Sequence, residues 1–312
     1  MVEEVPDPVP GPGEVVVDVG VAAVNYPDAL LVANRYQVSV PVPFTPGSEF
    51  AGIVRSLGDG VTGLHVGQRV RGVVFVGAFA ERICVPEAVL TPLPDGLDLA
   101  TAAASGVTYQ TAYHSLVDVA RLQPGEWVAV LGGAGGVGSA AVQLAHALGA
   151  RVVAAASSAE KLQVCRSMGA DATIDYTTED LKTRLKAITD GGADVVIDPV
   201  GGPHSEAALR AMRWGGRFVT VGFASGEIPR LPLNLVLLKG VSISAYEARG
   251  YIEHEPELAA AGSAALMAMV SDGRVRPHIG AVHPLADVVA ALEDVLGRRA
   301  VGKVLVRVGE AT

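Results

Sequence analysis

A glycine-rich segment carries the strongest chemical signal in this chain. Gly133-Ala-Gly-Gly-Val-Gly138 fits G-x-G-x-x-G, directly after the apolar run Trp127–Leu131 and directly before the Ala-rich stretch Ser139–Leu148. Such glycines permit a tight turn, let the backbone approach a pyrophosphate and allow close packing of a helix on a strand. The helix N-terminus adds free N–H donors and the positive end of its dipole. The sequence therefore predicts a dinucleotide site at Gly133, Gly135, Gly136, Val137 and Gly138.

The residues after the next apolar run indicate which dinucleotide is bound. A site that prefers NAD usually places Asp or Glu there for the ribose 2′-hydroxyl, and that carboxylate would repel a 2′-phosphate. Here the run ends Ala154-Ala-Ala-Ser-Ser158, and the first acid is Glu160. Ser157 and Ser158 can donate hydrogen bonds, and Lys161 can supply positive charge. This pattern predicts NADPH as the cofactor.

The middle of the chain alternates short apolar runs with helical patterns, and this alternation must position the glycine loop. Strands are expected at 127–131, 151–155, 172–174, 194–197, 217–221 and 241–245, with helices at 139–148 and about 159–168. Such alternation implies right-handed crossovers and a parallel, doubly wound sheet of the Rossmann type. The fold class is therefore α/β.

The two ends of the chain have a different character. Apolar, β-branched runs punctuated by Gly and Pro predict short strands at 14–19, 50–55 and 68–74, in a partly open barrel or sandwich. Residues 99–117 and those after about 247 are helical in pattern, and 303–308 is expected to return to the first domain as a strand. The expected domains are therefore 1–101 with 247–312, and a nucleotide-binding domain at 102–246.

Composition narrows the class of protein. The 312 residues are half hydrophobic and carry a net charge of −9, so two packed domains are expected, without a basic surface for nucleic acid or anionic membranes. The two cysteines predict neither a disulfide framework nor a zinc motif. No leader pattern opens the chain, and we expect a cytoplasmic protein. The uncharged stretch between Glu126 and Arg151 is long enough for a membrane span, but its clustered glycines favour strand, turn and helix.

Several motifs together resemble a known family. They are Val24-Asn-Tyr-Pro-Asp28, Pro43-Phe-Thr-Pro-Gly-Ser-Glu-Phe-Ala-Gly52, Gly67-Gln-Arg-Val70, the glycine loop, Val196-Ile-Asp-Pro-Val-Gly-Gly202, Gly222-Phe-Ala-Ser-Gly-Glu-Ile-Pro-Arg230, His283-Pro-Leu285 and Gly302-Lys-Val-Leu305. The whole chain resembles the zinc-independent quinone oxidoreductases of the medium-chain dehydrogenase/reductase superfamily, especially their quinone oxidoreductase-like type-two branch. The resemblance implies a barrel-like, GroES-like catalytic domain interrupted by the Rossmann domain, with the active site in the cleft between them.

The resemblance also assigns site residues. Lys161 and Tyr176 match the family's contacts to the adenosine 2′-phosphate. Asn25 and Tyr36 match its nicotinamide-side and substrate-cleft residues, and these two are the expected catalytic residues. Further expected cofactor contacts are Thr108, Gly222, Phe223 and the Gly302-Lys303 turn.

The chain departs from the zinc-dependent relatives at their metal sites. Those relatives carry a Cys before their first Asp-containing turn, a Gly-His-Glu triplet and a four-cysteine lobe. Here the first is Ala23-Val-Asn-Tyr26, the second is Gly47-Ser-Glu49, and the lobe is missing. The ligands for a carbonyl-polarising zinc are therefore lacking, and we expect an enzyme without zinc.

Loss of zinc favours a substrate that is already electron-poor. Hydride transfer from nicotinamide C4 to a quinone needs positioning and a hydrogen-bond donor, because the charge delocalises in the product. Tyr36, Asn25 or a water would stabilise or protonate the oxyanion; ordinary loop packing is the alternative for Tyr36. Two other functions remain open. One is an enone or enoyl-thioester reductase on the same scaffold, and the other is an NADPH-binding protein with a structural or sensing role.

The last strand of the predicted sheet bears on assembly. Val241–Ala245 follows Leu231-Pro-Leu-Asn-Leu-Val-Leu-Leu-Lys-Gly240 and is expected at the sheet edge, where unpaired backbone groups invite another chain. In the family this edge resembles a dimer seam, so we expect a homodimer. The alternative is that Leu233–Leu238 forms a buried helix that covers its own edge.

Overall fold

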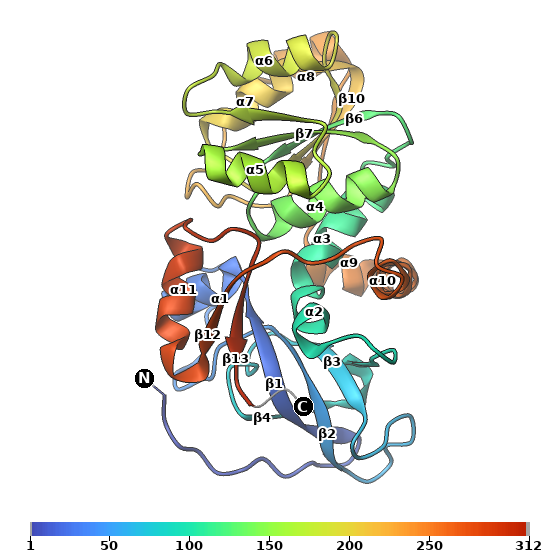
Figure 1. Ribbon diagram of the computed structural model, residues 1–312, viewed down its shortest axis with the longest axis vertical. Coiled ribbons are helices and arrows are strands. Elements are labelled where there is room, and N and C mark those ends of the chain that lie inside the picture. The colour runs from blue at the N-terminus through green and yellow to red at the C-terminus, as the bar shows by residue number, and fades with distance from the viewer. Residues whose placement is uncertain (1, 310–312) are drawn as a thin grey trace. The chain divides into compact units, whose positions relative to one another are not determined.

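The computed structural model describes residues 2–309, which form two compact units. Unit 1 contains residues up to Val107 together with those from Pro277 onward, and unit 2 is Thr108–Arg276. Residues 247–276 therefore group with the nucleotide-binding unit, whereas the sequence pattern had assigned them to the first domain. Each unit is described by itself below, and Figure 1 labels most of their elements.

Unit 1 is β-rich. Its elements are β1 (Glu14–Val24), α1 (Tyr26–Val32), β2 (Glu49–Leu57), β3 (Arg69–Val73), β4 (Arg82–Pro86), η1 (Glu87–Val89), β5 (Leu90–Pro92), α2 (Leu99–Ala104), β12 (Ile279–Pro284), η3 (Leu285–Asp287), α11 (Val288–Leu296) and β13 (Lys303–Arg307). The sheet runs β12-β13-β1-β2-β3-β5, and β4 pairs with β1. Alternate residues of β1 (Val15, Val17 and Val19) enter a core that α11 also packs against.

Strand β1 is the centre of this sheet and sets the register that matters for the site. It pairs antiparallel with both β2 and β13, placing Ala23 opposite Glu49 and Val24 opposite Val304. The residue that follows β1, Asn25, therefore lies beside the first residues of two other strands. At the β13 entry, a Cβ on Gly302 would lie 2.2 Å from the His278 carbonyl oxygen, so this approach requires glycine.

Unit 2 alternates strands and helices. Its elements are α3 (Val107–His114), a π-helical segment η2 (Ser115–Val119), β6 (Trp127–Leu131), α4 (Gly136–Ala147), β7 (Arg151–Ala156), α5 (Ala159–Ser167), β8 (Ala172–Asp175), α6 (Leu181–Ile188), β9 (Ala193–Asp198), α7 (Pro203–Arg210), β10 (Met212–Thr220), α8 (Leu233–Lys239), β11 (Ser242–Ala245), α9 (Ala248–His254) and α10 (Pro256–Ser271). The sheet order is β11-β10-β9-β6-β7-β8, and every pair is parallel. The predicted doubly wound parallel sheet is confirmed.

The central strands of unit 2 are continuous apolar runs, because helices cover both faces of the sheet. All six residues of β9 are buried. Helices α6, α7 and α8 pack on one face, and α4 and α5 lie over the other (Figure 1). Since all strands are parallel, the loops that follow β6, β7, β8 and β9 gather at one edge. No helix of residues 2–309 is long and apolar enough to cross a membrane.

Candidate functional site

The glycine loop forms the turn between β6 and α4. A Cβ on Gly138 would lie 2.0 Å from the Gly132 carbonyl oxygen, and one on Gly133 would lie 2.9 Å from Ala154 Cβ. Both positions therefore require glycine for close packing of helix on strand. Gly135 is the N-cap of α4 and has no capping side chain, so the N–H groups of the first turn are left for a ligand. The loop fits a bound pyrophosphate.

The residues predicted to contact the adenosine 2′-phosphate lie at the ends of β7 and β8. Ser157 follows β7 directly, and Ser158 caps α5 by accepting a hydrogen bond from the Lys161 N–H at 3.3 Å. The Tyr176 N–H donates to the Ala156 carbonyl at 3.2 Å, which holds this tyrosine beside the end of β7. The structure therefore brings Ser157, Lys161 and Tyr176 to the same edge of the sheet.

A third loop is organised by Asp198, which the sequence reasoning did not single out. This carboxylate is 1% exposed and accepts hydrogen bonds from the Gly201 N–H at 2.8 Å and the Ser205 hydroxyl at 2.5 Å. The Gly222 N–H donates to the Asp198 carbonyl at 3.4 Å, so Gly222 and Phe223 lie next to this loop. The available signal was an acid at the end of an apolar strand, followed by a Pro-Val-Gly-Gly turn.

Thr108 adds an unsatisfied polar group to unit 2. It lies in the first turn of α3 and is 6% exposed. Its Oγ1 is buried and has no hydrogen-bond partner among the described residues. A buried hydroxyl without a partner is destabilising by about 1–3 kcal/mol. An unpartnered hydroxyl at this predicted cofactor contact fits a position that a ligand would satisfy.

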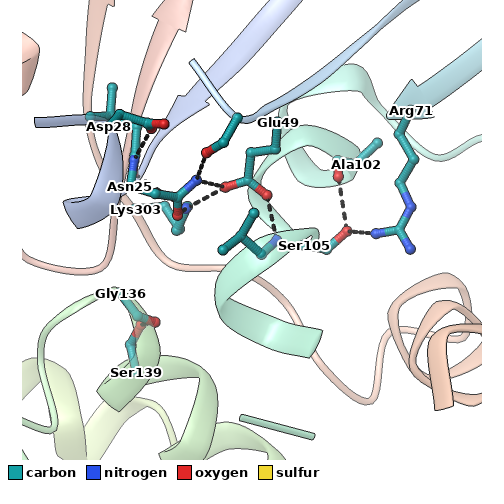
Figure 2. Close-up of polar contacts among 12 residues, drawn as sticks. Asn25, Asp28, Glu49, Arg71, Ala102, Ser105, Gly136, Ser139 and Lys303 are labelled. Atoms are coloured by element: carbon teal, nitrogen blue, oxygen red, sulfur yellow. Dashed lines mark hydrogen bonds and ion pairs between the residues drawn. The ribbon is translucent and has the colours of Figure 1, made fainter. Parts of the chain in front are cut away.

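Unit 1 contains a buried polar network at the start of β2 and β13 (Figure 2). The Lys303 ammonium donates to Glu49 Oε1 at 2.6 Å, to Asn25 Oδ1 at 2.8 Å and to the Val24 carbonyl at 3.4 Å. The other Glu49 oxygen accepts from the Val107 N–H at 2.7 Å. All three side chains are at most 3% exposed. The two opposite charges compensate one another out of contact with water.

This network fixes the orientation of the Asn25 amide. Lys303 can only donate and an ionised Glu49 can only accept, so the amide oxygen faces Lys303 and the NH₂ group faces Glu49. That NH₂ group donates to Glu49 Oε1 at 2.9 Å and to Ser48 Oγ at 3.1 Å. Asn25 and Glu49 are buried, whereas Ser48 is half-buried. Ser48 is therefore the member through which the network reaches the surface of its unit.

Sequence reasoning placed Asn25 in the site but missed Ser48. The signal was present, because Ser48 occupies the middle of the Gly47-Ser-Glu49 triplet where zinc-dependent relatives carry histidine.

Lys303, predicted to contact a cofactor, directs its ammonium into the network instead, and the cofactor contact stays a prediction. Tyr36 lies half-buried in the loop after α1.

Asp28 lies next to this network. It belongs to the first turn of α1 and accepts from the Asn25 backbone N–H at 2.7 Å, while its Oδ1 is buried without a partner among the described residues. Burial raises the pKa of Asp28 to about 7, and the nearby charge of Glu49 adds to this rise. Hydrogen bonds from Asn25 and Ser48 oppose the rise. At neutral pH this carboxyl group is therefore present in both its protonated and its ionised form.

The polar groups of the network around Asn25 are an amide, a hydroxyl, two carboxyl groups and an ammonium. Within residues 2–309, no group of three or more His, Cys, Asp or Glu side chains is placed to hold a metal ion. Independence from zinc stays a prediction.

Two family descriptions match the chain. Residues 11–95 match the alcohol dehydrogenase GroES-like domain, and residues 136–262 match the zinc-binding dehydrogenase family. The bovine (Bos taurus) quinone oxidoreductase-like protein 2 is 40% identical over 309 residues, which cover 98% of this chain and 88% of the relative.

Solved structures agree with this relationship. The quinone oxidoreductase of Thermus thermophilus, also solved in complex with NADPH, is 34% identical with a TM-score of 0.85, and the match covers 99% of this chain and 96% of that one. CurK enoyl reductase matches at 26% identity with a TM-score of 0.86, covering 98% and 94%. The resemblance stated from the motifs is confirmed: the chain belongs to the medium-chain dehydrogenase/reductase family of oxidoreductases and is related along its length to the quinone oxidoreductase-like proteins.

Proposed function

We propose that this protein is an NADPH-dependent reductase that transfers hydride to a quinone without zinc. The bovine relative is named for its likeness to quinone oxidoreductases, and the Thermus quinone oxidoreductase binds NADPH. The glycine loop of this chain fits a pyrophosphate, and the end of β7 has hydroxyl groups and Lys161 in place of a carboxylate. These features support NADPH over NADH.

The chain's own residues would hold the cofactor through backbone and side-chain donors. NADPH supplies the hydride when it is bound. The N-terminus of α4 holds the pyrophosphate, and Lys161 with Ser157 and Tyr176 holds the adenosine 2′-phosphate. The Thr108 hydroxyl gains the partner that it lacks.

The observation that carries the proposed chemistry is the contact between Ser48 and Asn25. Because the Asn25 amide donates to Ser48 Oγ, the hydroxyl proton of Ser48 is not used in that contact and can turn to another acceptor, either the Asp28 carboxylate or a bound substrate. During reduction its acceptor would be the substrate oxygen that gains negative charge. The buried Glu49 and Lys303 keep the amide in this orientation. A hydrogen-bond donor of this kind suits a quinone, which needs less polarisation than an isolated ketone.

Asp28 would supply the proton that completes the reduction. Its pKa of about 7 leaves it protonated in about half of the molecules at neutral pH, and the neighbouring Ser48 side chain influences that pKa. Ser48 would pass its proton to the substrate oxygen and receive one from Asp28, which is then reprotonated from solvent. Tyr36 would act as a second donor at the substrate.

A second candidate function is reduction of an enone or enoyl thioester. The similarity to CurK enoyl reductase favours it, since the same fold serves that chemistry. The Ser48 donor would serve the carbonyl oxygen of an enone equally well. The choice between quinone and enone therefore rests on measurement.

The reductase is further proposed to be a homodimer joined along β11. This strand is at the edge of the sheet, and Ile243 within it is exposed. Helix α8 buries Leu235 but leaves Leu237 and Leu238 at least 69% exposed, so part of its apolar surface is not covered by its own unit. An exposed edge with adjacent leucines supports pairing with a second copy.

Steady-state oxidation of NADPH against matched panels of quinones and enones tests the function. Turnover of quinones at higher kcat/KM than enones, unchanged by a zinc chelator, supports the proposal. Preference for enones would support the second function. Tight NADPH binding with no turnover of either panel would instead indicate a binding or sensing role, and activity abolished by chelation would contradict independence from zinc.

A further inference from the structure

Unit 2 has a hollow away from the edge that carries the glycine loop. It has a volume of about 590 Å³ and is lined by residues at the starts of strands, including Trp127 of β6, Arg151 of β7 and Met212 of β10. The glycine loop follows the opposite end of β6, and a five-residue strand spans about 15 Å. The volume falls in the usual range of small-molecule sites, which is about 300–1,000 Å³.

The hollow concentrates positive charge in an acidic protein. Arg151, Arg213 and Lys239 line it, against the single acid Asp190, while the whole chain carries a net charge of −9. Arg213 is partly neutralised by an ion pair with Asp194 at 3.2 Å. Arg151 and Lys239 are in no ion pair that the structure shows within residues 2–309, so their charges are not locally compensated.

Lys239 and Arg151 also retain donors. The Lys239 ammonium donates to the Met212 carbonyl at 2.6 Å, and Arg151 uses its Nε for the Gly125 carbonyl at 3.1 Å. An ammonium has three N–H groups and a guanidinium five, so both residues can bind a further acceptor. Burial lowers the pKa of Lys239, and the positive charges of Lys186 and Lys182 lower it further. An anion placed here would relieve that repulsion.

The hollow also contains both tryptophans of the chain. The Arg151 guanidinium lies over the Trp127 ring, 4.5 Å from its centre, which holds that cation at the wall. Trp214 is 75% exposed. Its ring is backed by the turn at Gly240, where a Cβ would lie 2.9 Å from the ring. Trp214 is therefore a supported aromatic face that solvent reaches, suited to stacking with a planar ring.

We propose that this hollow is a binding site for a small ligand that combines a planar ring with a phosphate group. The ring stacks on Trp214, and the phosphate is held by Lys239 and Arg151. The surplus of cations favours a dianion such as a phosphate monoester over a singly charged group. The site is separate from the proposed reductase chemistry and does not depend on it.

Intrinsic fluorescence tests the site directly, because both tryptophans line it. Phenyl phosphate would be titrated into the full-length protein saturated with NADP⁺, with tryptophan excited at the red edge of its band where the probe does not absorb. Inorganic phosphate and phenol supply the anion and the ring separately. We expect a saturable change with phenyl phosphate, at least tenfold tighter binding than either fragment, and weakening by added salt. Calorimetry under the same conditions gives the affinity independently.

Variants assign the binding to this hollow. Lys239→Gln and Arg151→Gln should each weaken phenyl phosphate about tenfold, whereas Arg274→Gln, which removes an exposed charge outside the hollow, should leave it unchanged. Trp214→Phe should remove most of the fluorescence change, and circular dichroism checks that each variant is folded. The proposal is overturned if phenyl phosphate shows no saturable binding or binds no more tightly than its fragments. It is also overturned if binding is seen only without NADP⁺, or if both cation variants keep the affinity of the unmodified protein.

Discussion

The Lys303 ammonium lies 2.6 Å from Oε1 of Glu49, and both side chains are 1% exposed. The partners are 254 positions apart and meet because β13 and β2 flank β1. A buried ion pair is weak evidence for stability by itself, since desolvation of both charges offsets most of their attraction. Its consequence here is orientational. The pair dictates which end of the Asn25 amide faces Ser48.

Replacing Lys303 with Met should strongly destabilise the protein. The Glu49 carboxylate would remain buried without its counter-charge, which is expected to lower the free energy of unfolding by about 3–5 kcal/mol. Urea unfolding followed by circular dichroism measures the change. The exposed Lys182→Met is the matched control and should have an effect below about 1 kcal/mol. A similarly small effect of Lys303→Met would show that the pair does not hold the network together.

Asp28→Asn should change how stability depends on pH. Because the pKa of Asp28 is raised from 3.8 to about 7 on folding, its contribution to stability is fully present below pH 3.8 and is lost as pH rises toward 7. Asn keeps the acceptor for the Asn25 N–H but does not titrate. The variant should therefore gain about 2 kcal/mol relative to the unmodified protein between about pH 5 and pH 8. Calorimetric unfolding across this range measures it, and parallel curves would contradict the shifted pKa.

Ser48→Ala should reduce turnover without affecting cofactor affinity. Removing a single donor to a developing oxyanion typically lowers kcat by about 100-fold. NADPH affinity should stay the same, because Ser48 belongs to unit 1 and accepts a hydrogen bond from Asn25, whereas the residues expected to hold the phosphates belong to unit 2. Ser56→Ala, a half-buried serine within β2, is the control. If kcat is unchanged in Ser48→Ala, the oxyanion donor must be another group, with Tyr36 the first candidate.

The Rossmann-type unit was largely predictable because its signals are local. The apolar run Trp127–Leu131 is observed as β6 with the same bounds. Strand β10 begins five residues earlier than the expected residue 217, since Gly215 and Gly216 interrupt its apolar pattern and shift its register. The edge position of β11 also agrees with the prediction.

What could not be predicted depends on contacts between distant residues. The helical pattern at 99–117 is broken at Gly106, where a Cβ would lie 2.3 Å from the Glu49 carboxylate. The sequence around Gly106 does not indicate that Glu49 lies beside it. Lysine is rarely buried, so the burial of Lys303 could not be expected before the pairing of β13 with β1 was known. The unsatisfied Oδ1 of Asp28 is likewise a property of packing, not of sequence.

Lys161→Ala should weaken NADPH binding selectively. Loss of a cation at the 2′-phosphate is expected to reduce NADPH affinity about tenfold or more, while NADH, which lacks that phosphate, should bind as before. The unmodified protein should itself bind NADPH more tightly than NADH. Fluorescence titration with both nucleotides measures this, and Lys182→Ala in the same unit serves as the control. Equal loss for both nucleotides would place Lys161 outside the 2′-phosphate site.

Ile243→Pro tests the proposed seam along β11. A proline in an edge strand removes one N–H donor, and in a parallel pair successive N–H groups point to opposite sides of the strand. Ser242→Pro and Ile243→Pro should therefore differ: the variant whose lost N–H pointed away from β10 should release monomers that keep their fold. Leu237→Glu on the neighbouring exposed helix face should weaken the dimer as well. Light scattering gives the mass, and circular dichroism confirms folding. If the unmodified protein is monomeric at micromolar concentration, the proposed dimer does not form. If a dimer persists in all three variants, the two copies meet at a surface other than β11.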